Sequence, residues 1–203
     1  MLIAELFAGG MDMGKKIAKV IRVLTTAPVF ALILCTILYL LVPGSFASLS
    51  HYLWALGFLV VLPLLAYPVA YVIPALRKKG RPLQRNLAVI FSVAGYVGGF
   101  LYVMLAGGTP TEKILFGTYL LSGVAIGICT ACHFKASGHT CGCSGPIAML
   151  AVTVNPWFLL GYGLLTPIIW ASKKLGRHTA GQMAAGVLIP VAAMLLCRAY
   201  FLV

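Results

Sequence analysis

One pentapeptide, residues 135–139, brings together a cation, a hydroxyl, a glycine and an imidazole between two long apolar runs. Ser137 and Gly138 are residue types that begin a helix and leave its first backbone N–H groups uncrowded. Such a helix terminus binds anions, phosphate above all. Lys135 would add positive charge, and His139 can hold or release a proton near neutral pH. The pentapeptide therefore predicts an anion site with acid–base chemistry, although the same residues also make an ordinary helix cap.

The segments that must position this pentapeptide have the composition of a membrane protein. The 203-residue chain is 62% hydrophobic and 9% charged, whereas soluble domains have about 45–50% apolar and about 25% charged residues. Three acids, Glu5, Asp12 and Glu112, stand against fifteen Lys and Arg, so the cations must meet water, lipid headgroups or an anionic ligand. No acidic side chain follows Glu112, which excludes hydrolysis by paired carboxylates in the second half of the chain.

The apolar runs predict an all-α polytopic bundle with about seven membrane spans, or six if the fifth and sixth do not both cross. We expect residues 1–22 to form a leader and basic anchor, and residues 23–203 to form one membrane domain. The fifth and sixth runs are short, and Asn155-Pro156 separates them, since proline disfavours helix at the preceding residue. The predicted spans are residues 23–42, 52–76, 86–106, 114–134, 140–154, 157–171 and 179–203.

Counting these spans places most cations at one membrane face. The N-terminal basic residues, residues 77–85, Lys135 and residues 173–178 emerge together, and Lys113 lies opposite. An excess of Lys and Arg in short loops marks the cytoplasmic side. We therefore expect a protein of the inner cell membrane with the pentapeptide facing the cytoplasm. Its expected partner is the lipid bilayer, and no nucleic acid is expected.

Three segments in this order resemble the signature of the type-2 phosphatidic acid phosphatase and haloperoxidase superfamily. They are Arg81-Pro82, then Ser137-Gly138-His139, then residues 173–178, which end in His178, with Gln182 four residues later. The family signature is a Lys, six residues and Arg-Pro; then Pro-Ser-Gly-His; then Ser-Arg, five residues, His, three residues and Asp. The resemblance covers about half of the chain.

The resemblance implies a membrane phosphatase for lipid phosphates or pyrophosphates that uses no cofactor. His178 would be the nucleophile that forms a phosphohistidine, and His139 would be the general acid that protonates the leaving oxygen. Gln182, at the position of the family's Asp, would orient His178. The residues that would hold the phosphoryl oxygens are Arg81, Lys78, Lys135, Ser137, Gly138 and Lys173.

Departures from the signature favour an alternative, a non-enzymatic protein that binds or moves a phosphorylated lipid. Pro74 stands seven residues before Arg81, where the family has Lys, and Ser172 stands at the Arg position six residues before His178. Gln182 cannot supply the negative charge that would stabilise a positively charged intermediate.

A third hypothesis is a metal or redox site among residues 129–143. Cys129-Thr-Ala-Cys132-His133 has the spacing of a c-type haem attachment site, and His139, Cys141 and Cys143 add further ligand types. The charge pattern puts these residues on the reducing side, and their spacing is irregular for zinc, so we expect no metal. Cys35 and Cys197 are expected to be ordinary apolar cysteines of membrane helices.

His51 lies beside Tyr52 and Trp54, aromatic residue types that gather at membrane interfaces. We expect His51 at such an interface and not as a ligand.

Overall fold

The computed structural model describes residues 12–73 and 80–202, and within these ranges the protein is helical and contains no strand. The predicted all-α class is therefore confirmed. The elements are α2 (Met13–Leu24), α3 (Ala27–Leu41), α4 (Leu49–Leu56), the π-helical turn η1 (Gly57–Val61), α5 (Leu62–Val72), α7 (Gly80–Leu105), α8 (Pro110–Ala131), α9 (Gly138–Thr153), the 3₁₀ helix η2 (Pro156–Leu164), α10 (Leu165–Lys174) and α11 (Ala180–Phe201).

Polar caps and prolines set the helix ends inside a uniformly apolar sequence. Thr109 caps α8 in a reciprocal capping box with Glu112, and Thr179 caps α11 in the same way with Gln182. Proline occupies the first turn of α3, α8 and η2, where its missing N–H costs no intrahelical hydrogen bond. These signals, and not the apolar content, determine where the chain turns.

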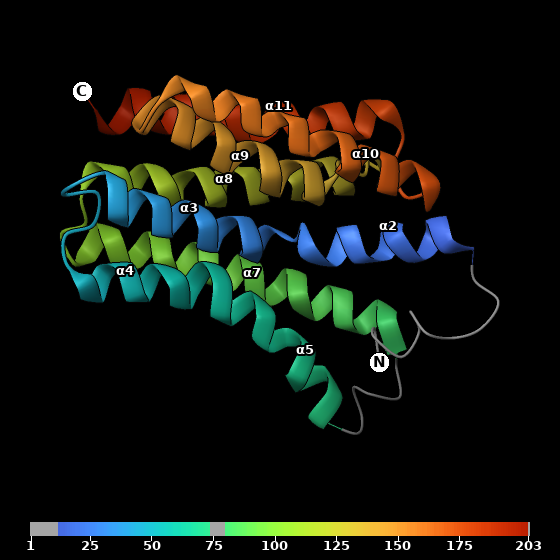
Figure 1. Ribbon diagram of the computed structural model, residues 1–203. Helices are drawn as coiled ribbons and strands as arrows, with labels where there is room; N and C mark the ends of the chain where they lie inside the picture. The colour runs from blue at the N-terminus through green and yellow to red at the C-terminus, as the bar shows by residue number, and fades with distance from the viewer. Residues whose placement is uncertain (1–11, 74–79, 203) are drawn as a thin grey trace.

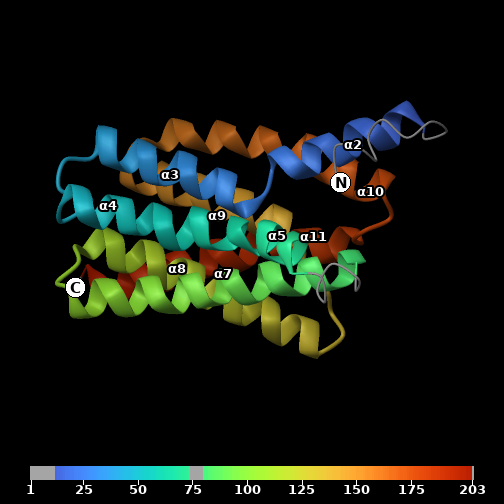
Figure 2. The same ribbon diagram turned by 90° about the horizontal axis from the view of Figure 1, so that it is seen from below.

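The helices form an elongated bundle in which successive segments run in alternate directions between two ends (Figure 1). One end carries the connections from α8 to α9 and from α10 to α11, together with the first half of α2; we call it the cation end. The other end carries the connections from α3 to α4 and from α7 to α8, and the chain's C-terminus (Figures 1 and 2). The basic residues of α2, Lys135 and the basic residues at the end of α10 thus share one end, whereas Lys113 lies near the start of α8 at the other.

Helix α9 is the centre of the bundle. All of its residues from Thr140 to Ala151 are buried, and it packs against α3, α11 and η2. Its sequence is rich in glycine, cysteine and serine, small residues that let neighbouring helices approach closely. The segment that follows the pentapeptide is therefore surrounded by protein.

Four described helices are long and apolar enough to cross a membrane: Leu49–Val72, Asn86–Leu105, Pro110–Ala131 and Ala180–Phe201. Helices α2 and α3 make a fifth if the pair, bent by 44°, is counted as one span. The predicted count of about seven spans is not confirmed. With 16 residues, α9 is only about 24 Å long at 1.5 Å per residue, less than the ~30 Å hydrocarbon core.

The first predicted span also has different bounds. The sequence predicted residues 23–42, but α2 already begins at Met13 and the helix breaks at Thr25 and Thr26. The basic residues before residue 23 are thus part of a helix, and that helix packs along α10. An ion pair of 3.0 Å between Asp12 Oδ2 and Lys174 Nζ ties the two helices at the cation end.

Candidate functional site

The start of α9 is built as the pentapeptide predicts. Ser137 is the N-cap, is fully buried, and its Oγ accepts a hydrogen bond from the Thr140 amide at 3.4 Å. The Ser137 amide donates to the carbonyl oxygen of Gln182 at 3.0 Å, which joins the cap to the first turn of α11. Gly186 permits this approach, because a Cβ there would collide with Thr140 Oγ1 and the Ser137 carbonyl oxygen. The α9 N-terminus is therefore held rigidly against α11.

His178 lies in the connection before α11 and contacts the pentapeptide. Its Nδ1 is 3.1 Å from the carbonyl oxygen of Lys135. A carbonyl oxygen only accepts hydrogen bonds, so this contact assigns the proton to Nδ1 and leaves a lone pair on Nε2. Partial burial lowers the pKa of His178 below its ordinary value, and the positive charges of Arg22 and Lys135 lower it further, against hydrogen bonds to the Lys135 carbonyl and Gln182 that raise it. The imidazole is thus biased toward its neutral form.

His139 is held by Arg22 of α2, a residue whose sequence position indicates only a basic anchor. His139 Nε2 lies 3.0 Å from the Arg22 carbonyl oxygen, and His139 Nδ1 lies 3.4 Å from Arg22 Nη2. The carbonyl therefore takes the Nε2 proton, and Nδ1 faces the guanidinium as an acceptor. Arg22 Nη1 also donates to Ser172 Oγ at 3.0 Å, and Ser172 is fully buried. One arginine thus links α2, the start of α9 and the end of α10.

The other residues that the resemblance named are placed as follows. The Gln182 side chain accepts a hydrogen bond from the Thr179 amide at 3.0 Å as part of the capping box, so it serves the start of α11 as well as lying near His178. Gly138 and Lys173 are exposed at the cation end. Arg81 lies in the first turn of α7, its side chain outside the described part of the structure, and Lys78 lies outside the described residues.

An apolar cavity of about 260 Å³ lies beside the start of α9. Residues of α3, α7, α8, α9 and α11 line it, and Gly138 and Cys141 lie on its α9 wall. A space for a hydrocarbon chain therefore reaches the helix terminus that carries His139.

The proposed metal ligands do not gather into one site. Within the described residues, no group of three or more His, Cys, Asp or Glu side chains is arranged to hold a metal ion. Cys141 and Cys143 are buried inside α9, whereas Cys132 and His133 are exposed in the preceding connection. The cysteine spacing in the sequence thus does not become a ligand cluster in space.

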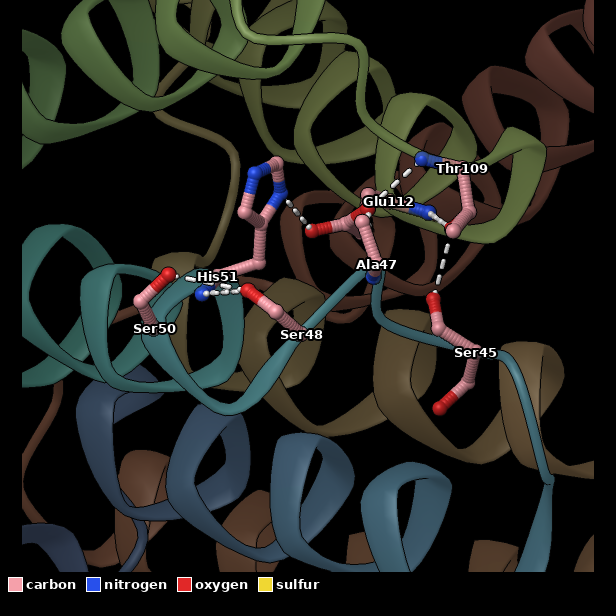
Figure 3. Close-up of polar contacts among 7 residues, drawn as sticks. All are labelled: Ser45, Ala47, Ser48, Ser50, His51, Thr109 and Glu112. Carbon is pink, nitrogen blue, oxygen red and sulfur yellow. Dashed lines mark hydrogen bonds and ion pairs between the residues drawn. The ribbon is translucent and has the colours of Figure 1, made fainter.

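The expectation for His51 did not include its buried contact with Glu112. His51 is 9% exposed, and its Nδ1 lies 2.7 Å from Oε1 of Glu112, which is 1% exposed (Figure 3). Glu112 Oε2 accepts hydrogen bonds from the amides of Thr109 and Ala47, at 2.6 and 3.3 Å. The pair therefore binds together the α3–α4 and α7–α8 connections, at the end of the bundle opposite the cation end. We call it the clasp.

Of the two clasp residues, only Glu112 is indicated by the sequence. Thr109-Pro110-Thr111-Glu112 is the pattern of a capping box, which predicts Glu112 at the third position of a helix. Nothing in the sequence around His51 indicates that it lies against Glu112, 61 positions later.

Comparisons with known protein families, with characterised proteins and with solved structures find no match to this chain. The chemistry of the site must therefore be argued from its own residues.

Proposed function

We propose that the protein is an integral membrane phosphatase that hydrolyses a lipid phosphate or pyrophosphate through a phosphohistidine on His178. The hydrogen bond from His178 Nδ1 to the Lys135 carbonyl carries this proposal. It fixes the tautomer whose Nε2 lone pair can attack phosphorus, and the lowered pKa keeps that nitrogen unprotonated at neutral pH. In the family that the sequence resembles, a carboxylate has this orienting role; here a neutral carbonyl oxygen takes it.

The surrounding charge suits a transferring phosphoryl group, which needs positioning and positive charge more than covalent chemistry. Arg22 and Lys135 are close enough for their charges to act on His178. The N-terminus of α9 adds the positive end of a helix dipole, capped by Ser137. Lys173, Gly138, Arg81 and Lys78 remain proposed phosphate-binding residues.

The proposed reaction has two steps. The Nε2 atom of His178 forms a bond to phosphorus while the bond from phosphorus to the lipid oxygen breaks, and His139 gives its proton to that oxygen. Water then attacks phosphorus, the bond to His178 breaks, phosphate leaves, and His139 takes up the proton from water. For this, phosphate must draw the Arg22 guanidinium away from His139 Nδ1, so that Nδ1 takes up a proton from solvent. The resulting imidazolium can then give the lipid oxygen its Nε2 proton, once that proton is released from the Arg22 carbonyl.

We further propose that all seven segments cross the inner cell membrane, with α9 enclosed by other helices and η2 on the outer surface of the bundle, and that the cation end faces the cytoplasm. The excess of Lys and Arg at that end supports the orientation. Reporter fusions at Lys113 and after Val203 test it. A reporter at Lys113 that is active only in the cytosol would overturn this topology.

One observation favours a second function, binding or transport of a phosphorylated lipid without hydrolysis. Both ring nitrogens of His139 are occupied by Arg22, so the group assigned as general acid is not directed toward a substrate. In addition, neither the Lys135 carbonyl nor Gln182 offers the negative charge that would stabilise a positively charged phosphohistidine step. In a serine protease, an unrelated enzyme that also relies on an oriented histidine, loss of the orienting carboxylate's charge lowers turnover about 10⁴-fold.

Phosphate release by the purified protein from phosphatidate and from a prenyl phosphate distinguishes the two functions. Hydrolysis is expected in the wild type and is expected to disappear in His178→Ala. His133→Asn is the matched control, because it removes an exposed histidine at a left-handed backbone position (φ 60°) that asparagine tolerates. Activity that survives His178→Ala refutes the nucleophile. Phosphatidate binding without release, weakened by Lys135→Ala, establishes the second function instead.

A further inference from the structure

The outer side of α2 carries a stripe of apolar side chains that the bundle leaves exposed. Its members recur every three or four residues and are 39–69% exposed: Met13, Ile17, Val20 and Leu24. This spacing puts them on one face of the helix, one above the other. The inner side of α2 is already packed, because Ala18 is fully buried and the helix lies along α10. The stripe is therefore separate from the contact that holds α2 to the bundle.

Cations surround this stripe at the cation end. Those that are exposed or partly exposed come from α2, the end of α10 and the connection to α11: Lys15, Lys16, Lys173 and Arg177. Of the two acids in the described part of the chain, Glu112 lies at the opposite end and Asp12 is paired with Lys174. The surface beside the stripe is therefore positively charged.

Neither water nor the hydrocarbon core suits a helix with both features. In water, the stripe would leave a contiguous apolar patch bare, which soluble surfaces rarely do. In the hydrocarbon core, Lys15 and Lys16 would be costly, since charged side chains are rare there and face the protein interior. The boundary between acyl chains and headgroups suits both, because apolar side chains enter the acyl layer while lysines reach toward the phosphates.

The junction of α2 and α3 brings α2 to this boundary. With α3 crossing the membrane as proposed above, its 15 residues span about 22 Å, less than the ~30 Å core, so the last turn of α2 completes the crossing. The helix axis bends by 44° between α2 and α3, and α2 reaches further out at the cation end than α7 or α11 (Figures 1 and 2). The first turns of α2 then run obliquely through the headgroup layer.

We infer that α2 docks on the anionic lipid leaflet at the cation end, with the apolar stripe in the acyl layer and Lys15 and Lys16 on the phosphates of anionic phospholipids. These lipids are partners of the outer surface and not substrates, because Arg22 of the same helix faces inward to Ser172 and His139. The inference rests on the proposed membrane crossing of α3 and on no catalytic step. It implies that the leaflet holds the helix that positions His139.

A nitroxide label measures the depth of each side of α2. The background Cys129→Ser/Cys132→Ser removes the two cysteines that are not buried. In it, the label is attached to Ile17→Cys or to Lys15→Cys, two exposed positions on different faces of the helix. The proteins are placed in nanodiscs of phosphatidylglycerol and phosphatidylcholine, and power saturation compares collisions with oxygen and with an aqueous nickel complex. We expect the label at position 17 to favour oxygen and the label at position 15 to favour the nickel complex.

The lipid charge is tested by varying the phosphatidylglycerol fraction. The label at position 17 should move deeper as this fraction rises, and Lys16→Gln should raise the fraction needed for half of the change about fivefold, the factor for one lysine at an anionic surface. Lys113→Gln, at the opposite end, is the matched control and should change nothing. A label at position 17 that the nickel complex reaches as readily as the label at position 15, or a depth independent of phosphatidylglycerol, overturns the inference. Neither readout involves hydrolysis, so failure of the proposed phosphatase leaves this test intact.

Discussion

His51→Ala should destabilise the protein strongly, because it removes one partner of the clasp. The carboxylate of Glu112 is 1% exposed and accepts three hydrogen bonds, from His51 Nδ1 and from the amides of Thr109 and Ala47. A hydrogen bond to a charged group contributes about 1.5–3 kcal/mol, and breaking a buried pair by removing one partner costs about 3–5 kcal/mol. The two amides remain on Oε2, so we place the loss near ~3 kcal/mol, where the two ranges meet.

The loss should appear as a fall in the thermal unfolding midpoint of the detergent-purified protein, followed by far-ultraviolet circular dichroism. For a chain of this size, about 1 kcal/mol shifts Tm by ~2–4 °C, so His51→Ala should lower Tm by roughly 6–12 °C. Ser50→Ala is the matched control, since Ser50 lies on the same helix, is exposed and bonds only the exposed Ser48. It should shift Tm by no more than about 2 °C, the usual size for a surface substitution.

A double-mutant cycle with Glu112→Gln shows whether the two residues act through each other. Glutamine keeps an oxygen for the amides of Thr109 and Ala47 and loses the charge that attracts His51. The double variant His51→Ala/Glu112→Gln should therefore be at least about 1 kcal/mol more stable than the two single losses predict together. Additive losses, or a His51→Ala protein with the Tm of Ser50→Ala, would refute the clasp as a source of stability.

Three further predictions concern the cation end. The ¹⁵N resonances of the His178 ring should titrate below about pH 6.5, since burial and nearby cations lower its pKa. The unfolded chain takes up that proton at higher pH than the folded protein does, so the free energy of unfolding should fall as the pH drops from about 6.5 through the lowered pKa. A titration midpoint above about 6.5 would contradict the assigned environment of His178. Gly186→Ala should lower the free energy of unfolding by about 1–3 kcal/mol, because the new Cβ would collide with Thr140 and Ser137 at the start of α9. Gly181→Ala is the control: its Cβ would meet no atom within 4 Å, so the change should be neutral or slightly stabilising. Chemical denaturation of both variants measures the difference. A maleimide reagent should modify the exposed Cys132 rapidly in the native protein and the buried Cys141 only after unfolding. Mass spectrometry of the digested protein measures this order, and modification of Cys141 before Cys132 in the native protein would contradict the prediction.

The fold was predictable where a single apolar run is bounded by strong local signals. The run 86–106 became the candidate span Asn86–Leu105, because Gly107 turns the chain with a positive φ of 73° directly after it. The runs 140–154 and 157–171 were less predictable. A buried helix such as α9 is as apolar as a lipid-facing one, and hydropathy does not report whether lipid or protein surrounds it.

The candidate site was predictable only as far as local sequence extends. The N-cap at Ser137 follows from residue types within a few positions. The partners of the two histidines do not, because Arg22 reaches His139 across 117 positions, and the Lys135 carbonyl reaches His178 across 43. A hydrogen bond from a side chain to a distant backbone carbonyl cannot be predicted from residue types, because every residue carries such a carbonyl. For that reason the sequence assigns Gln182 to His178, although its side-chain oxygen also caps α11.

The placement of the acids explains why the cation end keeps its charge. Among the described residues, Glu112 is buried in the clasp at the opposite end, and Asp12 pairs on an exposed surface with Lys174. Three acids in the whole chain cannot neutralise fifteen Lys and Arg. The net charge of the cation end attracts any anion and is screened by salt. The tautomer of His178, by contrast, is fixed by one short contact that salt does not screen. Under the proposed function, affinity for phosphorylated lipids and the capacity to cleave them would therefore depend on separate features of this end, and loss of cleavage would not by itself remove binding.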